Sequence, residues 1–128
     1  MTDEISEQEL PRLLETFYRR VRADPMLGPV FEAAVDDWPS HLALLARFWS
    51  SVMLTSGRYK GNPVAAHMRR ADQITPDMFK RWLELWTQTT GELLSPKGAA
   101  AMQSKARRIG ESLQLALAYR TDKPIQAQ

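Results

Sequence analysis

The sequence predicts an all-α protein, and three observations carry that prediction. Apolar residues recur at spacings of three and four along most of the chain, which is the period of one face of a helix. No segment alternates apolar and polar residues in the manner of a strand. Segments rich in proline and glycine separate the periodic stretches, as turns between helices do.

The first helix is expected to begin near Ser6 and to stop before Pro25. Its apolar stripe follows spacings of four, three and four, and consists of Leu10, Leu14, Phe17 and Val21. Residues 24–29 contain two prolines and a glycine, so the chain should turn there. A short helical segment that includes Phe31 is expected to follow.

Residues 36–39 predict the start of a second long helix, because carboxylates suit the positive end of the helix dipole and proline is tolerated in the first turn. This helix should run to about residue 55. One face of it includes His41, Leu45, Phe48 and Val52, and Leu42, Trp49 and Met53 widen that face. Residues 56–63 hold two glycines and a proline and should be irregular, which leaves room for only a short helix from 63 to about 70.

Two further helices should start at residues 75–76 and 95–96, where a threonine or serine cap precedes a proline. The first presents an aromatic and leucine-rich face: Phe79, Trp82, Leu83, Leu85, Trp86 and Leu93. The second carries a stripe made of Met102, Ala106, Ile109, Leu113 and Leu117. No pattern continues beyond Thr121, so we expect a frayed tail at 121–128 and a folded core at about 6–120, within one domain that spans 1–128.

The composition indicates a soluble globular domain. Hydrophobic residues make up 44% and charged residues 25%, and a chain of 128 residues can bury one core. The net charge of +2 is too small to indicate a nucleic-acid partner. No apolar run approaches the roughly 20 residues of a membrane span, and the acidic start MTDEISEQEL lacks the basic and apolar regions of a secretion signal. We therefore expect a cytoplasmic protein without a membrane partner.

Several kinds of chemistry are excluded by residue types and spacing. The chain has no cysteine, which removes disulfides, thiolate zinc sites, iron–sulfur clusters and cysteine nucleophiles. Its two histidines, His41 and His67, have no partner at zinc-ligand spacing. No glycine-rich phosphate loop and no serine in a nucleophile elbow is present, so hydrolase and kinase functions have no support.

A haem site has other requirements: a neutral imidazole for the iron, an apolar slot for the ring and a few donors on the opposite face. His67 lies on the predicted short helix, and His41 lies on an apolar stripe. Tyr18 and Trp82 bring polar hydrogens to apolar helical faces. Periodicity alone favours structural roles for all four residues, because histidines and buried aromatics on helical faces more often pack or lie exposed than bind a ligand. The haem-site reading stays open beside it at this point.

Several stretches, in order and spacing, resemble the group III truncated haemoglobins. They are FYRRVRADPMLGPVF at 17–31, DWPSHLALLARFWSSVMLTSGRYKGNP at 37–63, His67, and FKRWLELW at 79–86. The resemblance covers about residues 10–117. It implies the truncated globin fold, a two-over-two helical sandwich, with haem b as cofactor. Helices of unequal length joined by Pro- and Gly-rich turns also suit globin packing better than a bundle of four equal rods.

The resemblance assigns roles to the residues on either side of the haem. It makes His67 the proximal iron ligand. It makes Tyr18 and Trp82 the polar groups over the bound gas, with His41 as the histidine on that same distal side. These four residues would carry the gas chemistry.

Further residues of the resemblance lie around the haem ring. The aromatic residues that match the family are Phe17, Phe31 and Phe48. Arg58 and Tyr59 are placed to meet a haem propionate, which the donor fork of arginine suits. The chain departs from its relatives after His67, where it reads MRRADQI instead of a leucine-rich stretch with proline. This departure bears on the propionate contacts and leaves the iron ligand unaffected.

The resemblance implies reversible binding of oxygen or nitric oxide, with a reductase partner that the sequence does not identify. The same pocket would also suit an enzyme for nitric oxide dioxygenation or peroxide reduction, because polar distal donors assist cleavage of an O–O bond. A helical interaction module without a cofactor is the remaining alternative.

Overall fold

The computed structural model describes the backbone of residues 5–122 and the side chains of residues 5–119. The helices follow in the order α1 (Glu9–Ala23), α2 (Gly28–Ala34), α3 (Trp38–Leu54), α4 (Pro63–Met68), a 3-10 helix η1 (Ala71–Gln73), α5 (Pro76–Leu93) and α6 (Pro96–Asp122). No strand occurs between residues 5 and 122, which confirms the all-α prediction. None of the helices in this part of the chain is both long and apolar enough to cross a membrane.

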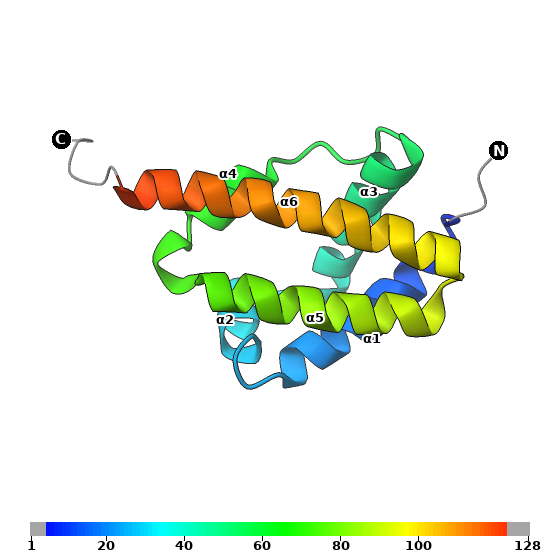
Figure 1. Cartoon of the computed structure of the whole chain (residues 1–128), viewed down its shortest axis with the longest axis horizontal. Coiled ribbons are helices and arrows are strands. Elements are labelled where there is room, and N and C mark those ends of the chain that lie inside the picture. The colour runs from blue at the N-terminus through cyan, green and yellow to red at the C-terminus, as the bar shows by residue number, and fades with distance from the viewer. Residues whose placement is uncertain (1–4, 123–128) are drawn as a thin grey trace.

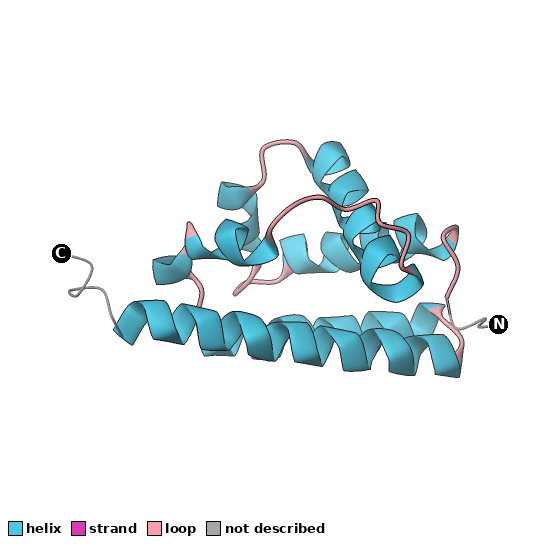
Figure 2. Ribbon diagram, turned by 90° about the horizontal axis from the view of Figure 1, so that it is seen from above, coloured by secondary structure: helices cyan, strands magenta, loops and turns pink. Residues whose placement is uncertain are grey.

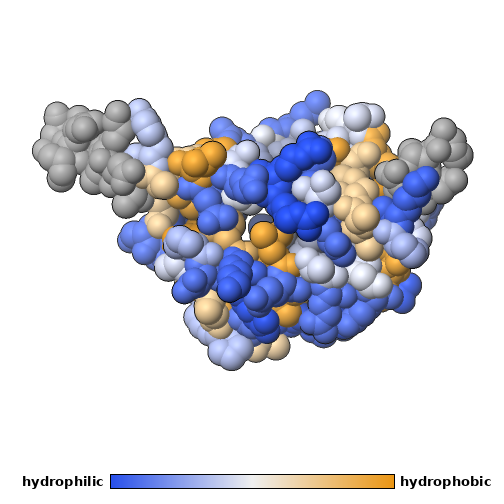
Figure 3. Space-filling model, in the orientation of Figure 1, coloured by the Kyte–Doolittle hydropathy of each residue, from blue (hydrophilic) through white to orange (hydrophobic). Residues whose placement is uncertain are grey.

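The helices form two layers. Helices α5 and α6 run side by side in opposite directions along the long axis (Figure 1). They make up one layer when the molecule is viewed from above (Figure 2). In the other layer α1 packs against α3 and α2, and contacts of α1 with α5 and of α4 with α6 join the layers. Polar side chains cover most of the face that α5 and α6 present, with apolar ones between them (Figure 3).

The core is built mainly on α1. The predicted stripe of this helix is buried, and its buried residues are Leu10, Leu13, Leu14, Phe17, Tyr18 and Val21. Three indoles stack across the layers: the centroid of Trp86 lies 5.0 Å from Trp82 and 4.8 Å from Trp49. The predicted stripe of α6 also faces the core, since Met102, Ala106, Leu113 and Leu117 are buried.

Most of the helix starts predicted from caps are found in the structure. Side chains of Asp37, Thr75 and Ser95 accept hydrogen bonds from backbone N–H groups three residues on. The first helix begins at Glu9, later than predicted, because Ser6 opens a turn in which its N–H donates to Glu9 Oε1 over 2.9 Å. At the other end α6 reaches Asp122, so residues 121–122 of the predicted frayed tail are helical. The rest of that tail, 123–128, lies outside the described residues.

Gly28 begins α2 instead of lying in the predicted turn. A Cβ atom at this position would lie 2.6 Å from the carbonyl oxygen of Arg22, closer than real Cβ contacts. Only glycine therefore allows α2 to start against the end of α1.

Asp24 holds the corner between α1 and α2 and ties it to α5. Its carboxylate accepts the N–H groups of Met26 and Leu27, both over 3.0 Å, and the Arg81 Nε–H over 2.7 Å. Burial acts to raise the pKa of Asp24, but Arg81 and the two backbone donors together hold that pKa below its ordinary value. The turn at Asp24 thus contacts Arg81, which directly precedes Trp82 on α5.

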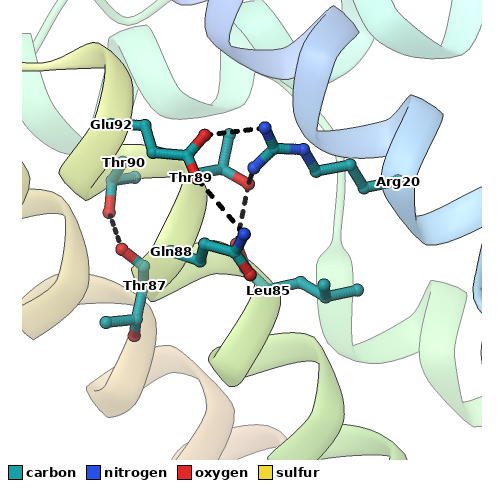
Figure 4. A network of polar contacts seen from close by, with 7 residues as sticks. All are labelled: Arg20, Leu85, Thr87, Gln88, Thr89, Thr90 and Glu92. Carbon is teal, nitrogen blue, oxygen red and sulfur yellow. Dashed lines mark hydrogen bonds and ion pairs between the residues drawn. The ribbon is translucent and has the colours of Figure 1, made fainter.

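Arg20 makes a second tie between α1 and α5 (Figure 4). Its guanidinium donates to Thr89 Oγ1 over 3.0 Å and to Glu92 over 2.6 Å. Thr89 is fully buried and donates its own hydroxyl to the Leu85 carbonyl. Two polar ties therefore fix α1 along α5, and these two helices carry Tyr18 and Trp82.

Candidate functional site

Tyr18 lies at the centre of an aromatic group contributed by α1, α2, α3 and α5. Only 5% of Tyr18 is exposed. Its ring centroid lies 4.7 Å from Phe17, 5.8 Å from Phe31 and 6.5 Å from His41. Phe17 in turn lies 5.0 Å from Trp82. The fold therefore brings together five of the residues that the sequence assigned to the haem pocket.

The Tyr18 hydroxyl and the Trp82 indole interact. Burial strongly raises the pKa of the Tyr18 hydroxyl, and the Trp82 side chain acts in the opposite direction through hydrogen bonding. An indole N–H can only donate, so it favours the phenolate by donating to the Tyr18 oxygen. Burial prevails, and the hydroxyl keeps its proton at neutral pH. Tyr18 thus offers one O–H donor in apolar surroundings.

His41 occupies the edge of this aromatic group. Half-burial lowers the pKa of its imidazole, so the ring is neutral at pH 7. The ring also borders an open groove of about 270 Å³ whose wall includes Asp36, Asp37 and Ser40. His41 therefore separates Tyr18 from a route to solvent.

Trp38 belongs to the same aromatic group, although the sequence pattern indicated it only as part of a helix start. Its ring lies 5.9 Å from Tyr18 and 5.7 Å from His41, and the Arg22 guanidinium carbon lies 4.6 Å from its centroid. The spacing of three residues between Trp38 and His41, which places both on one helix face, was the signal that could have identified it.

The apolar face of α3 leads from this group toward the loop before α4. Its Phe48 lies 5.2 Å from Tyr59, whose N–H donates to Ser51 Oγ over 2.8 Å. Partial burial raises the pKa of the Tyr59 hydroxyl. Arg58 lies apart from this pair, because its guanidinium donates to Glu7 just before α1, over 2.8 Å. The two residues predicted to meet a propionate therefore have different partners.

Helix α3 is the most apolar of the four long helices, yet only Trp49 and Ser50 of its 17 residues are buried. Several apolar side chains along it touch the core but remain partly exposed, among them Leu42, Leu45, Phe48, Val52 and Met53. Exposed apolar area of this kind is stabilised when an apolar group covers it. The flat, largely apolar ring of a haem is a group of that kind.

His67 is oriented on α4 by its own helix. Asn62 caps α4 by accepting the Ala65 N–H over 3.1 Å, and the Nδ1 atom of His67 lies 2.7 Å from the Pro63 carbonyl oxygen. A carbonyl oxygen only accepts, so Nδ1 carries the proton, and in the neutral imidazole Nε2 keeps its lone pair. Histidines that bind metals are commonly oriented by such a bond.

This donor set suits a metal that arrives with its own ligands. Within residues 5–122 no group of three or more His, Cys, Asp and Glu is arranged to hold a metal ion. A single half-buried imidazole with a free Nε2 is what haem iron requires of a protein. The residues present therefore fit a haem.

Comparison with known proteins agrees with this geometry. No family model matches the chain. A curated relative, the group 3 truncated haemoglobin ctb of Campylobacter jejuni, is 27% identical over 114 residues, which are 86% of this chain and 89% of the relative. The crystal structure of the group III truncated haemoglobin from Campylobacter jejuni superposes with a TM-score of 0.79 at 28% identity, over 91% of this chain and 94% of that one. The chain is therefore a homologue of the group III truncated haemoglobins and has the truncated globin fold that the sequence predicted.

Proposed function

We propose that the chain binds haem b through His67 and reversibly binds oxygen or nitric oxide beside Tyr18 and Trp82. The observation that carries this proposal is the bond between His67 Nδ1 and the Pro63 carbonyl, which leaves Nε2 free to bind iron in a homologue of haemoglobins. Covalent attachment through thioether bonds would need cysteine, and the chain has none. Non-covalent haem b is therefore the expected form.

The apolar ring would lie along α3. Phe48 and its apolar neighbours on that helix would cover one face, with Phe17 and Phe31 beyond the distal residues. The Tyr59 hydroxyl would meet a propionate at the edge. Arg58 would reach the second propionate only by exchanging its bond to Glu7, so we assign it the weaker role.

Haem, when bound, would supply the iron that binds a diatomic gas, and the bound gas would carry partial negative charge. Tyr18 and Trp82 would donate their polar hydrogens to that charge. A bond of this kind stabilises by a net ~1 kcal/mol, which slows release about fivefold. His41 would control access, since it lies between Tyr18 and the groove of Asp36 and Asp37. Such a pocket suits retention of a gas or chemistry on it better than rapid delivery.

An enzyme for nitric oxide dioxygenation or peroxide reduction is the second candidate. The interaction between the Tyr18 hydroxyl and the Trp82 indole favours it, because two polar hydrogens in an apolar wall can assist cleavage of an O–O bond. Such an activity would need a reductase partner to return the haem to its ferrous form.

The test is an absorption titration of the purified chain with haemin. A Soret band that saturates at one haem per chain supports the proposal, and failure to bind haem would leave the interaction module as the explanation. On the loaded protein, stopped-flow kinetics with oxygen, nitric oxide and peroxide rank the two candidates. Turnover with nitric oxide or peroxide faster than oxygen release would favour the enzyme.

A further inference from the structure

An open groove of about 590 Å³ borders Tyr18 where α1, α2 and α3 meet. Its wall includes Arg22, Glu32 and Trp38, one residue from each of these helices. This groove and the smaller one beside His41 both reach the aromatic group from the surface. Contacts among α1, α2 and α3 at this groove can therefore control access to the Tyr18 side of the pocket.

Arg22, Glu32 and Trp38 form a contact that we name the corner latch. Arg22 Nε donates to Glu32 Oε2 over 2.7 Å, and the same guanidinium lies 4.6 Å from the Trp38 ring centroid. Arg22, and to a smaller extent Trp38, hold the pKa of Glu32 below its usual range. The latch thus connects three helices through side chains.

The latch is weak enough to open and close. Arg22 is 43% exposed and Glu32 48% exposed, and ion pairs at such positions contribute little to stability. The Trp38 indole nitrogen is buried and has no hydrogen-bond partner among the described residues. Packing and the guanidinium therefore hold the Trp38 ring, and loss of either partner of the ion pair would free it.

Trp38 restrains His41 directly. The two rings lie one helical turn apart on α3, with centroids 5.7 Å apart and planes at 89°. Tyr18 touches both rings, and the groove of Asp36 and Asp37 lies on the side of His41 that leads to solvent. The Trp38 and Tyr18 rings thus lie against the imidazole, and loss of the Trp38 ring would leave it room to turn toward that groove.

We propose that Trp38, held by Arg22 and Glu32, is a positioning residue that keeps the His41 ring beside Tyr18 and thereby sets how fast a gas reaches the pocket. The inference rests on the proposed function, because it assigns the control of access within the same site. The exposed ion pair of Arg22 and Glu32 would then affect the rate of gas entry strongly, although such a pair contributes little to the stability of the fold.

The test measures carbon monoxide association after flash photolysis and oxygen release by stopped flow on the haem-loaded protein. Glu32→Gln weakens the ion pair without removing any ring, and Trp38→Leu removes the Trp38 ring itself. Both should raise the association rate several fold and leave oxygen release unchanged. Arg19→Met is the matched control, since it removes a cation from α1 in the wall of the same groove but leaves the latch intact.

Two further measurements separate positioning from simple loosening of the fold. In a His41→Leu background the latch substitutions should have no further effect on association, because their action passes through the imidazole. In the haem-free protein, the NMR titration of His41 should move toward the ordinary histidine pKa in Trp38→Leu, as burial of the ring is reduced and Asp36 and Asp37 come within reach.

An association rate that stays at the wild-type value in both latch variants would overturn the inference. So would an equal increase in the His41→Leu background, which would make Trp38 a plug that acts without His41. A wild-type chain that binds no haem refutes the proposed function instead, and the His41 titration in the haem-free protein still decides whether Trp38 confines the imidazole.

Discussion

Replacement of Tyr18 by phenylalanine tests the distal pair most sharply. The substitution keeps the ring, so the contacts with Phe17 and Phe31 remain and the fold should be retained. It removes the hydroxyl oxygen with which the Trp82 indole interacts. In the variant without a gas, the Trp82 N–H then lies among aromatic rings with no hydrogen-bond acceptor. When a gas binds, the gas becomes that acceptor.

The sign and size of the effect follow from this asymmetry. A polar hydrogen left without an acceptor in buried surroundings costs about 1–3 kcal/mol, and that cost falls on the gas-free protein alone. Loss of the Tyr18 bond to the gas removes about 1 kcal/mol from the gas-bound protein. The balance favours the gas-bound state by about 1 kcal/mol, so oxygen release should slow about fivefold. Trp82→Phe removes the second donor and should speed release.

Oxygen displacement by carbon monoxide in a stopped-flow instrument measures these rates in the wild type, both single variants and the double variant. Faster oxygen release from Tyr18→Phe, together with an unchanged release rate in Trp82→Phe, would refute the idea that the Trp82 N–H bonds to Tyr18 without a gas and to the gas when one is bound. If neither variant alters release, the polar distal pocket itself is wrong. Haem content measured on each sample controls for loss of the cofactor.

Three other substitutions test the rest of the site and the corner that supports it. His67→Ala should lose tight haem binding, with added imidazole restoring it, and a normal haem content and spectrum would disprove the ligand assignment. His41→Leu should raise the carbon monoxide association rate more than it changes oxygen release, whereas faster release with unchanged association would make His41 a donor to the gas, and a low-spin bis-histidine resting spectrum would make it an iron ligand. Asp24→Asn should lower the free energy of unfolding in urea by about 2 kcal/mol at pH 7, because a buried carboxylate with three donors loses its charge. The folded pKa of Asp24 lies below its unfolded value of about 3.9, so this stabilisation is present above that pH and is lost as pH falls through the folded pKa. The difference between Asp24→Asn and the wild type should therefore shrink below pH 4, and a constant difference down to pH 2 would contradict the assignment.

The sequence predicted the parts of the fold that local chemistry determines. The stripe of α1 and the caps at Asp37 and Thr75 depend on neighbours within one helix, and all are present. Gly28 was expected in a turn because prolines stand near it in the sequence. In the structure a glycine is needed there because the start of α2 lies close to the Arg22 carbonyl. That approach is a tertiary distance, and no local pattern contains it.

The candidate site divides in the same way. Residue types and the family resemblance indicated Tyr18, Trp82 and His67, and the structure supplies the bond that orients His67. The contact of Trp38 with Arg22 joins two helices, and the ion pair of Arg58 with Glu7 joins residues 51 positions apart. Spacing along one helix cannot reveal such contacts, because they depend on which faces meet after folding.

The tryptophans of this chain will report on different parts of it in optical experiments. Trp82, Trp86 and Trp49 stack at centroid distances of 5.0 and 4.8 Å with planes within 20° of parallel, so their excited states are coupled. Circular dichroism in the near ultraviolet should therefore carry a strong signal from this row, and the signal should vanish when α3 separates from α5. Trp38 lies outside this row and beneath the Arg22 guanidinium, so its fluorescence depends on the contacts among α1, α2 and α3 at the surface. The chain thus carries two intrinsic probes, one for the packing of its layers and one for the corner of α1, α2 and α3.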